Sequence, residues 1–132
     1  MTSSEATNSA VRPGAKPRGL NRLLKAFGNT GKGLAGCWRE EEAFRQECLL
    51  ALVAIPAGIW LGANGVERAM LIAPMLLILV VELLNSAIET AIDRIGTERH
   101  ALSGLAKDLG SAAVFVSFVL LASTWALVLL GR

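Results

Sequence analysis

VELLNSAIETAIDR, residues Val81 to Arg94, continues an apolar run that begins at Ala69 and contains no charge before Glu82. A helix turns about 100° per residue, so positions three, seven and eleven after Glu82 fall near one line on its surface. Those positions hold Asn85, Glu89 and Asp93. The segment therefore predicts a membrane helix with a single polar stripe on an otherwise apolar surface.

Three interpretations of this polar stripe make different demands on the residues. A soluble amphipathic helix is disfavoured, because the preceding run is too apolar. Asn85 and Ser86 suit structural hydrogen bonds between membrane helices. Carboxylates are harder to explain in that way, because a charge inside a bilayer is costly and usually faces a bundle interior or an aqueous cleft. The two glutamates therefore favour a functional site on the stripe.

Composition supports a membrane protein of one domain. Of the 132 residues, 53% are hydrophobic and 18% charged, and the mean hydropathy is +0.51. The net charge of +2 is too small to indicate a nucleic-acid partner. The two cysteines, Cys37 and Cys48, form no metal-binding or disulfide motif and are interpreted as small apolar residues.

The fold predicted from these patterns is an all-α membrane protein. Residues 1–18 are expected to form a disordered cytoplasmic tail, and 19–132 a membrane domain. An amphipathic surface helix is expected at about 19–28, ended by a break at Gly28–Gly31. Membrane spans are expected at about 43–63, 69–92 and 110–130. Ser103 to Ser111 is expected as a connection, with Gly104 and Gly110 as turn or helix-end signals. Three spans enclose a polar stripe poorly, so we expect a homo-oligomer.

The distribution of Lys and Arg predicts the orientation. Eight of them lie at or before the start of the first span, three lie between the second and third spans, and two lie on the opposite side. By the positive-inside rule, the N-terminus and the Asp93–Asp108 connection are cytoplasmic. Glu82 then lies deep in the membrane, and Glu89 lies nearer the cytoplasmic surface.

The chemistry expected at this surface is phosphoryl transfer. No P-loop and no G-x-G-x-x-G motif is present. Carboxylates (Glu41, Glu82, Glu89) and cations (Arg22, Lys107) are instead expected at one membrane surface. Carboxylate oxygens suit Mg²⁺ on nucleotide phosphates, cations offset phosphate charge, and a carboxylate with little water around it can accept a hydroxyl proton.

Four segments together resemble the bacterial integral-membrane diacylglycerol kinase family: EEAFRQE (41–47), VELLNSAIE (81–89), DRIG (93–96) and SGLAKDLGSAA (103–113). The resemblance covers about Arg22 to Leu130. It implies a homotrimer in the bacterial inner (cytoplasmic) membrane, with MgATP as phosphate donor and diacylglycerol as the lipid acceptor. Departures from the family pattern occur at Glu42, Asn29 and Arg99.

The resemblance also implies roles for individual residues. Glu82 would be the catalytic base, Glu41 and Glu89 would hold Mg²⁺, and Asn85 would support them. The ATP contacts would come from two stretches of the chain, 22–41 and 89–108. They are Arg22, Asn29, Glu41, Glu89, Glu98, Arg99, His100, Lys107 and Asp108. The lipid alcohol would contact Arg22, Phe44, Arg45, Glu47, Glu82 and Ser111.

Two alternatives remain open at the level of sequence. Undecaprenol kinase uses a similar scaffold on a polyprenyl alcohol, and the segment AFRQE (43–47) favours diacylglycerol over it. A small oligomeric proton-coupled transporter would use Glu82 as a proton carrier. That alternative gives no joint role to Glu41, Glu89 and Lys107.

Overall fold

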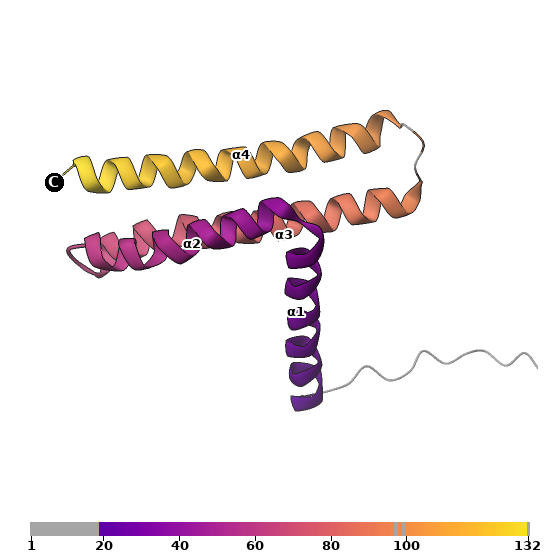
Figure 1. The fold of residues 1–132 in the computed structure, drawn as a ribbon, viewed down its shortest axis with the longest axis horizontal. Coiled ribbons are helices and arrows are strands. Elements are labelled where there is room, and N and C mark those ends of the chain that lie inside the picture. Colours follow the sequence, from indigo (N-terminus) through magenta and orange to yellow (C-terminus); the bar gives the residue numbers. More distant parts are fainter. Residues whose placement is uncertain (1–18, 97, 99, 132) are drawn as a thin grey trace, which may run out of the picture. The chain divides into compact units, whose positions relative to one another are not determined.

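The computed structural model describes residues 19–96, 98 and 100–131, and within them every regular element is a helix. The four helices are α1 (Leu20–Glu40), α2 (Glu42–Leu61), α3 (Gly65–Ile95) and α4 (Ala101–Leu130) (Figure 1). The expected all-α class is confirmed. The tail expected at 1–18 lies outside the described residues.

The first helix is longer than the sequence predicted. The chain divides into two compact units, with the boundary after Gly33, inside α1. We expected a break at Gly28–Gly31, but α1 continues from Leu20 to Glu40. Glycine lowers helix stability by about 1 kcal/mol relative to alanine without excluding helical backbone angles. The Thr30 hydroxyl donates to the Ala26 carbonyl at 3.0 Å, a bond that is compatible with a continuous helix.

Three helices are long and apolar enough to cross a bilayer: Glu42–Leu61 (20 residues), Gly65–Ile95 (31) and Ala101–Leu130 (30). The last two extend beyond the predicted spans. The expected connection at Ser103–Ser111 is wrong, because α4 already begins at Ala101. The His100 side chain caps α4 by accepting from the Leu102 N–H at 3.2 Å, which starts the helix nine residues earlier than expected.

The turn between α2 and α3 is fixed by a reciprocal cap. The Asn64 side chain accepts from the Glu67 N–H at 3.0 Å, and the Glu67 carboxylate accepts from the Ala63 N–H at 3.0 Å. Arg68 Nε donates to the Gly62 carbonyl at 3.0 Å. The Asn64 bond satisfies one free N–H of α3, and the other two bonds tie the turn residues Ala63 and Gly62 to side chains of α3. Together they fix the tight turn between α2 and α3.

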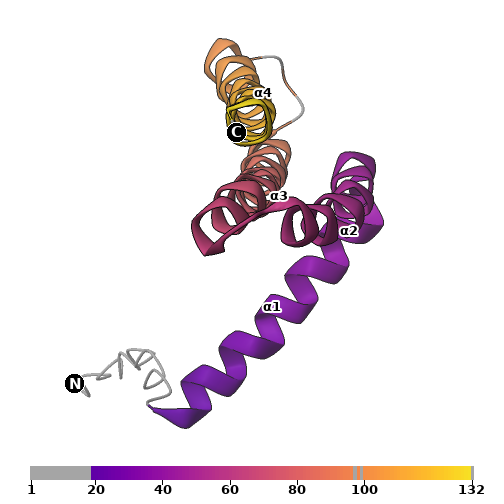
Figure 2. The same cartoon turned by 90° about the vertical axis from the view of Figure 1, so that its left-hand side faces the viewer.

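In the unit that begins at Leu34, α3 lies between α2 and α4 (Figure 2). The side chains of Leu71, Met75 and Ile78 on α3 are completely buried. Trp125 of α4 donates its indole N–H to the Leu71 carbonyl at 2.9 Å. Many large apolar side chains of α2, α3 and α4 are exposed, as bilayer-facing helices require. The protein is therefore a multi-pass membrane protein whose central helix carries the polar stripe.

Candidate functional site

The deepest polar residues of α3 are Glu82 and Ser86, which lie one turn apart on the same face. Glu82 is 3% exposed and Ser86 is 8% exposed. The α1–α2 junction lies against this face, since the Cys37 thiol donates to the Ser86 hydroxyl oxygen at 3.6 Å. Enclosing a carboxylate almost fully in an apolar helix bundle is costly. Its retention points to a functional role.

Three carboxylates gather around Cys37. Burial raises the pKa of the Cys37 thiol, its hydrogen bond with Ser86 lowers that pKa, and the negative charges of Glu41, Glu82 and Glu47 raise it further. We call these three glutamates, with Cys37 and Ser86, the carboxylate cluster. The helix break that forms it is at Glu41, whose extended backbone (φ −109°, ψ 111°) precedes α2. The Glu41 side chain makes no capping hydrogen bond, which leaves its carboxylate available to a ligand.

Residues 44–47 of α2 close the cluster from the other side. Phe44 is 4% exposed, and Glu47 is buried with its Oε2 atom lacking any hydrogen-bond partner among the described residues. The Arg45 guanidinium donates to the carbonyls of Trp38 (2.8 Å) and Arg39 (3.2 Å). Arg45 therefore caps the C-terminal end of α1, where cations complement the unsatisfied carbonyls.

Asn85 and Glu89 extend the cluster along α3. The Asn85 amide donates to Glu89 Oε1 at 3.3 Å, and both side chains are half-buried. Glu89 interacts electrostatically with Glu82 on one side and with Lys107 of α4 on the other. Glu89 thus connects the carboxylate cluster to a second group of polar residues between α3 and α4.

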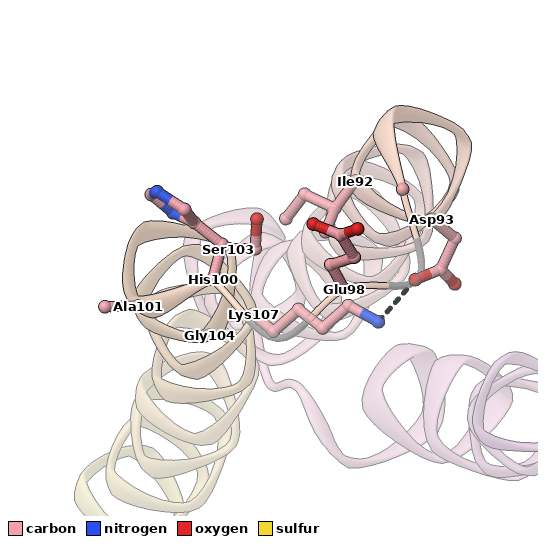
Figure 3. A pocket seen from close by; sticks show the side chains of 9 residues that line it. Ile92, Asp93, Glu98, His100, Ala101, Ser103, Gly104 and Lys107 are labelled. Atoms are coloured by element: carbon pink, nitrogen blue, oxygen red, sulfur yellow. Dashed lines mark hydrogen bonds and ion pairs between the residues drawn. The ribbon is translucent and has the colours of Figure 1, made fainter.

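That second group lines a cleft of about 410 Å³, which we call the α3–α4 cleft (Figure 3). Lys107 reaches from α4 to Asp93 on α3, with 2.7 Å between Nζ and Oδ1. Because His100 Nδ1 accepts the α4 cap, Nε2 is the nitrogen left for a ligand. The full lining is Ile92, Asp93, Gly96, Glu98, His100, Ala101, Ser103, Gly104 and Lys107.

The predicted site residues fall into three groups. The structure brings Glu41, Glu47, Glu82, Asn85 and Glu89 together around the carboxylate cluster, and Glu98, His100 and Lys107 around the α3–α4 cleft. Asp108 and Ser111 are exposed on α4 and do not line the cleft. Arg22 and Asn29 belong to the other compact unit, and Arg99 lies outside the described residues.

Sequence reasoning did not assign Cys37, Ser86 or Gly110 to the site, and it placed Asp93 on the polar stripe without giving it a binding role. The partners in Cys37–Ser86 and Asp93–Lys107 are 49 and 14 residues apart, so no local spacing connects them. Gly110 was interpreted as a turn residue, whereas it is a buried position in the middle of α4. Among these residues, only Asp93 could have been predicted from the sequence, because it continues the polar stripe at helical spacing.

The groups here that could hold a metal ion are carboxylates. No cluster of three or more His, Cys, Asp or Glu residues suited to a metal ion occurs within 19–96, 98 and 100–131. Mg²⁺ usually takes only one or two protein carboxylates and completes its shell with water and substrate phosphate. Glu41, with its uncapped carboxylate, and the half-buried Glu89 both act electrostatically on Glu82, and they are the residues that could hold such an ion.

Comparison with known proteins identifies the family. The family model described as prokaryotic diacylglycerol kinase matches residues 28–129. The diacylglycerol kinase of Pseudomonas aeruginosa strain PAO1 is 51% identical over 113 residues, which cover 86% of this chain and 92% of that protein. The diacylglycerol kinase of Escherichia coli strain K12 is 46% identical over 111 residues, which cover 84% of this chain and 91% of that protein. The diacylglycerol kinase of Helicobacter pylori strain 26695 is 43% identical over 116 residues, which cover 88% of this chain and 91% of that protein. The chain therefore belongs to the prokaryotic diacylglycerol kinase family.

Proposed function

We propose that this protein is a lipid kinase that transfers the γ-phosphoryl group of ATP to the free hydroxyl of diacylglycerol, giving phosphatidic acid. The observation that carries the proposal is the burial of Glu82, 3% exposed, beside Glu41 and Glu47 in a membrane helix bundle. The names of the relatives support the choice of acceptor.

The depth of each residue supports its proposed role. The lipid hydroxyl arrives from the bilayer, so the base belongs at the buried carboxylate, Glu82. A carboxylate oxygen of Glu82 would take the hydroxyl proton as the alcohol oxygen attacks the γ-phosphorus. The bond between that phosphorus and the β–γ bridging oxygen breaks at the same time, and ADP leaves. Glu89 lies two turns nearer the cytoplasmic end of α3 and, with Glu41, would hold Mg²⁺. When bound, this ion would neutralise charge developing on the phosphates.

The residues of the α3–α4 cleft would bind the nucleotide. The Lys107 ammonium is a cation at the mouth of the cleft, and a phosphate oxygen would replace its present partner, the exposed Asp93 carboxylate. His100 Nε2 and the polar side chains of Glu98 and Ser103 offer hydrogen bonds to the ribose or base. Glu89 then lies between the two substrates, where the phosphoryl group must pass.

The proposed assembly is a homotrimer in the bacterial inner membrane, with the N-terminus in the cytoplasm. One observation supports an oligomer: the polar side chains of Glu89 and Asn85 are only half-buried in one chain. A neighbouring subunit would complete the enclosure of these polar groups. The mass of the protein in detergent, measured by light scattering, tests this assembly.

One assay separates the candidate functions. Purified protein in lipid nanodiscs would receive γ-labelled ATP, Mg²⁺ and either dioleoylglycerol or undecaprenol, and labelled lipid would be quantified. We expect labelled phosphatidic acid and little labelled undecaprenyl phosphate. The reverse preference would assign the chain to polyprenyl alcohols, and proton flux without lipid labelling would overturn the kinase proposal.

A further inference from the structure

The Asp93 carboxylate is paired with Lys107, the only lysine or arginine among the described residues that line the α3–α4 cleft (Figure 3). The distance from Lys107 Nζ to Asp93 Oδ1 is 2.7 Å. The two side chains are open to solvent, with 40% of Lys107 and 67% of Asp93 exposed. An ion pair with this exposure is screened by water and salt, so a charged ligand can replace either partner.

This ion pair is not needed to join α3 to α4. The two helices already meet where Gly110 lies against Asn85, and where the Trp125 indole donates to the Leu71 carbonyl at 2.9 Å. Lys107 is also the only hydrogen-bond partner of the Asp93 side chain in the part of the chain that the structure describes. The effect of Asp93 is therefore to be sought at Lys107 and at the ligands of the cleft.

Negative charge outweighs positive charge around the cleft. Asp93 and Glu98 line it, and Glu89, one turn before Asp93 on α3, acts electrostatically on Lys107. Against these three carboxylates, the described lining residues offer the single Lys107 ammonium. A polyphosphate that enters the cleft is therefore attracted by one group and repelled by three.

A phosphate that binds Lys107 must first displace Asp93. The displaced carboxylate remains close by, because Asp93 belongs to the last turn of α3, and it then faces the phosphates. Its repulsion grows with the negative charge of the ligand. Metal-free ATP carries two more negative charges than MgATP, because Mg²⁺ is a dication, so Asp93 disfavours the metal-free nucleotide more strongly.

We propose that Asp93 is a specificity-determining residue, which keeps Lys107 paired until a phosphate replaces it and disfavours nucleotides that arrive without Mg²⁺. The proposal rests on the proposed function, because it concerns the phosphate donor of the same reaction. It assigns Asp93 no contact with metal or nucleotide: the residue acts by occupying Lys107 and through its own charge. A metal-free nucleotide on Lys107 would otherwise fill the site without reacting.

Calorimetry measures this selectivity without turnover. The full-length protein, in lipid nanodiscs without diacylglycerol, would be titrated with MgATP and separately with ATP in EDTA. At about 0.1 M salt, Asp93→Asn should tighten the binding of metal-free ATP about 3-fold more than that of MgATP, as expected for two extra charges acting through water and salt over several ångströms. The difference should grow at lower salt, because screening then weakens.

Two variants and one ligand serve as controls. Asp93→Glu keeps the charge and should keep the wild-type preference for MgATP. Glu42→Gln removes an exposed carboxylate that does not line the cleft, and it should leave both affinities unchanged. Adenosine has the base and ribose without phosphate, so Asp93→Asn should not change its affinity.

Three results would refute the role of Asp93: equal changes in both nucleotide affinities, no change in either, or a selective loss of MgATP binding. The last result would make Asp93 a metal ligand. A tighter binding of adenosine in Asp93→Asn would also count against it, because the effect would then not act on phosphate.

Failure of this proposal can be told apart from failure of the kinase function. If the protein phosphorylates dioleoylglycerol while Asp93→Asn changes both nucleotide affinities equally, the role of Asp93 is wrong and the kinase function stands. If Asp93→Asn selectively strengthens the binding of metal-free ATP but no lipid is phosphorylated, the selectivity stands and the kinase function is wrong.

Discussion

Gly110 of α4 lies directly against the amide oxygen of Asn85 on α3. A Cβ atom at position 110 would overlap Asn85 Oδ1 and lie 3.2 Å from Asn85 Cγ. The missing side chain therefore permits the close approach of the two helices and holds the amide with its Nδ2 atom toward Glu89. A position that is unremarkable in sequence thus determines the geometry of the polar stripe.

Gly110→Ala should destabilise the protein by about 1–3 kcal/mol, the usual cost of inserting a methyl group into a filled space. It should also reduce turnover, since the Asn85 amide must move from Glu89. Unfolding in a series of denaturing detergent concentrations measures the first effect. Gly104→Ala is the control, because its Cβ would meet open space and helix propensity favours alanine. Equal stability of the two variants would contradict the proposed packing.

Glu82→Gln should reduce turnover by about 10²-fold to 10⁴-fold, the contribution of a positioned general base. MgATP binding, measured by calorimetry, should be retained, because the nucleotide groups are assigned to the α3–α4 cleft. Glu42→Gln serves as the control, since Glu42 is exposed in the first turn of α2 and should keep wild-type turnover. Loss of MgATP binding in Glu82→Gln would instead make Glu82 a metal ligand.

Lys107→Gln should raise the KM for MgATP by about 10-fold or more, as expected for losing a charged hydrogen bond to phosphate. The KM for the lipid should stay the same. Arg94→Gln removes a nearby cation that does not line the cleft, and its KM for MgATP should match the wild type. Steady-state kinetics with each substrate varied in turn separates these outcomes. If the KM for MgATP rose equally in both variants, the effect would come from the loss of positive charge in general and not from a specific contact of Lys107.

Trp125→Phe should lower the free energy of unfolding by about 1 kcal/mol, because it removes the indole N–H that donates to the Leu71 carbonyl while keeping an aromatic ring. Trp60→Phe is the control. Trp60 is 84% exposed, so the same substitution there should leave the free energy of unfolding unchanged. The denaturing-detergent titration used for Gly110→Ala measures both variants.

The reactivity of Cys37 should depend on its carboxylate neighbours. Burial and the charges of Glu41, Glu82 and Glu47 hold the pKa of the thiol above its usual range, so at neutral pH it has less thiolate than an ordinary cysteine. Its labelling rate should keep rising at alkaline pH after that of an exposed thiol has levelled off. Glu41→Gln removes one negative charge and should lower the pKa, which moves the rise to lower pH.

The rate of methyl methanethiosulfonate labelling as a function of pH, in the Cys48→Ala background and without metal ions, measures this pKa. Ser86→Ala should move the rise in the opposite direction to Glu41→Gln, because the Ser86 hydrogen bond lowers the pKa. A rise at the same pH in all three proteins would show that the cluster charges do not reach Cys37.

The sequence by itself determined the class of fold and the polar stripe. Helical periodicity places Glu82, Asn85 and Glu89 on one line of one helix, and hydrophobic length alone predicts three spans. The polar line and the three spans both follow from local sequence. In a bilayer the backbone must satisfy its own hydrogen bonds, so a long apolar segment has few alternatives to a helix. The helix ends were less predictable: Gly28, Gly31, Gly104 and Gly110 suggested turns, but all four lie inside helices.

Only the tertiary structure decided which residues meet across helices. The contacts Cys37–Ser86, Asp93–Lys107 and Gly110–Asn85 join residues on different helices, so no helical repeat in the sequence predicts them. Each depends on how α4 and the α1–α2 junction pack against α3, and on the local backbone that begins α2 at Glu42 and α4 at Ala101. Helix packing is set by the shapes of facing side chains, which a one-dimensional periodicity does not contain.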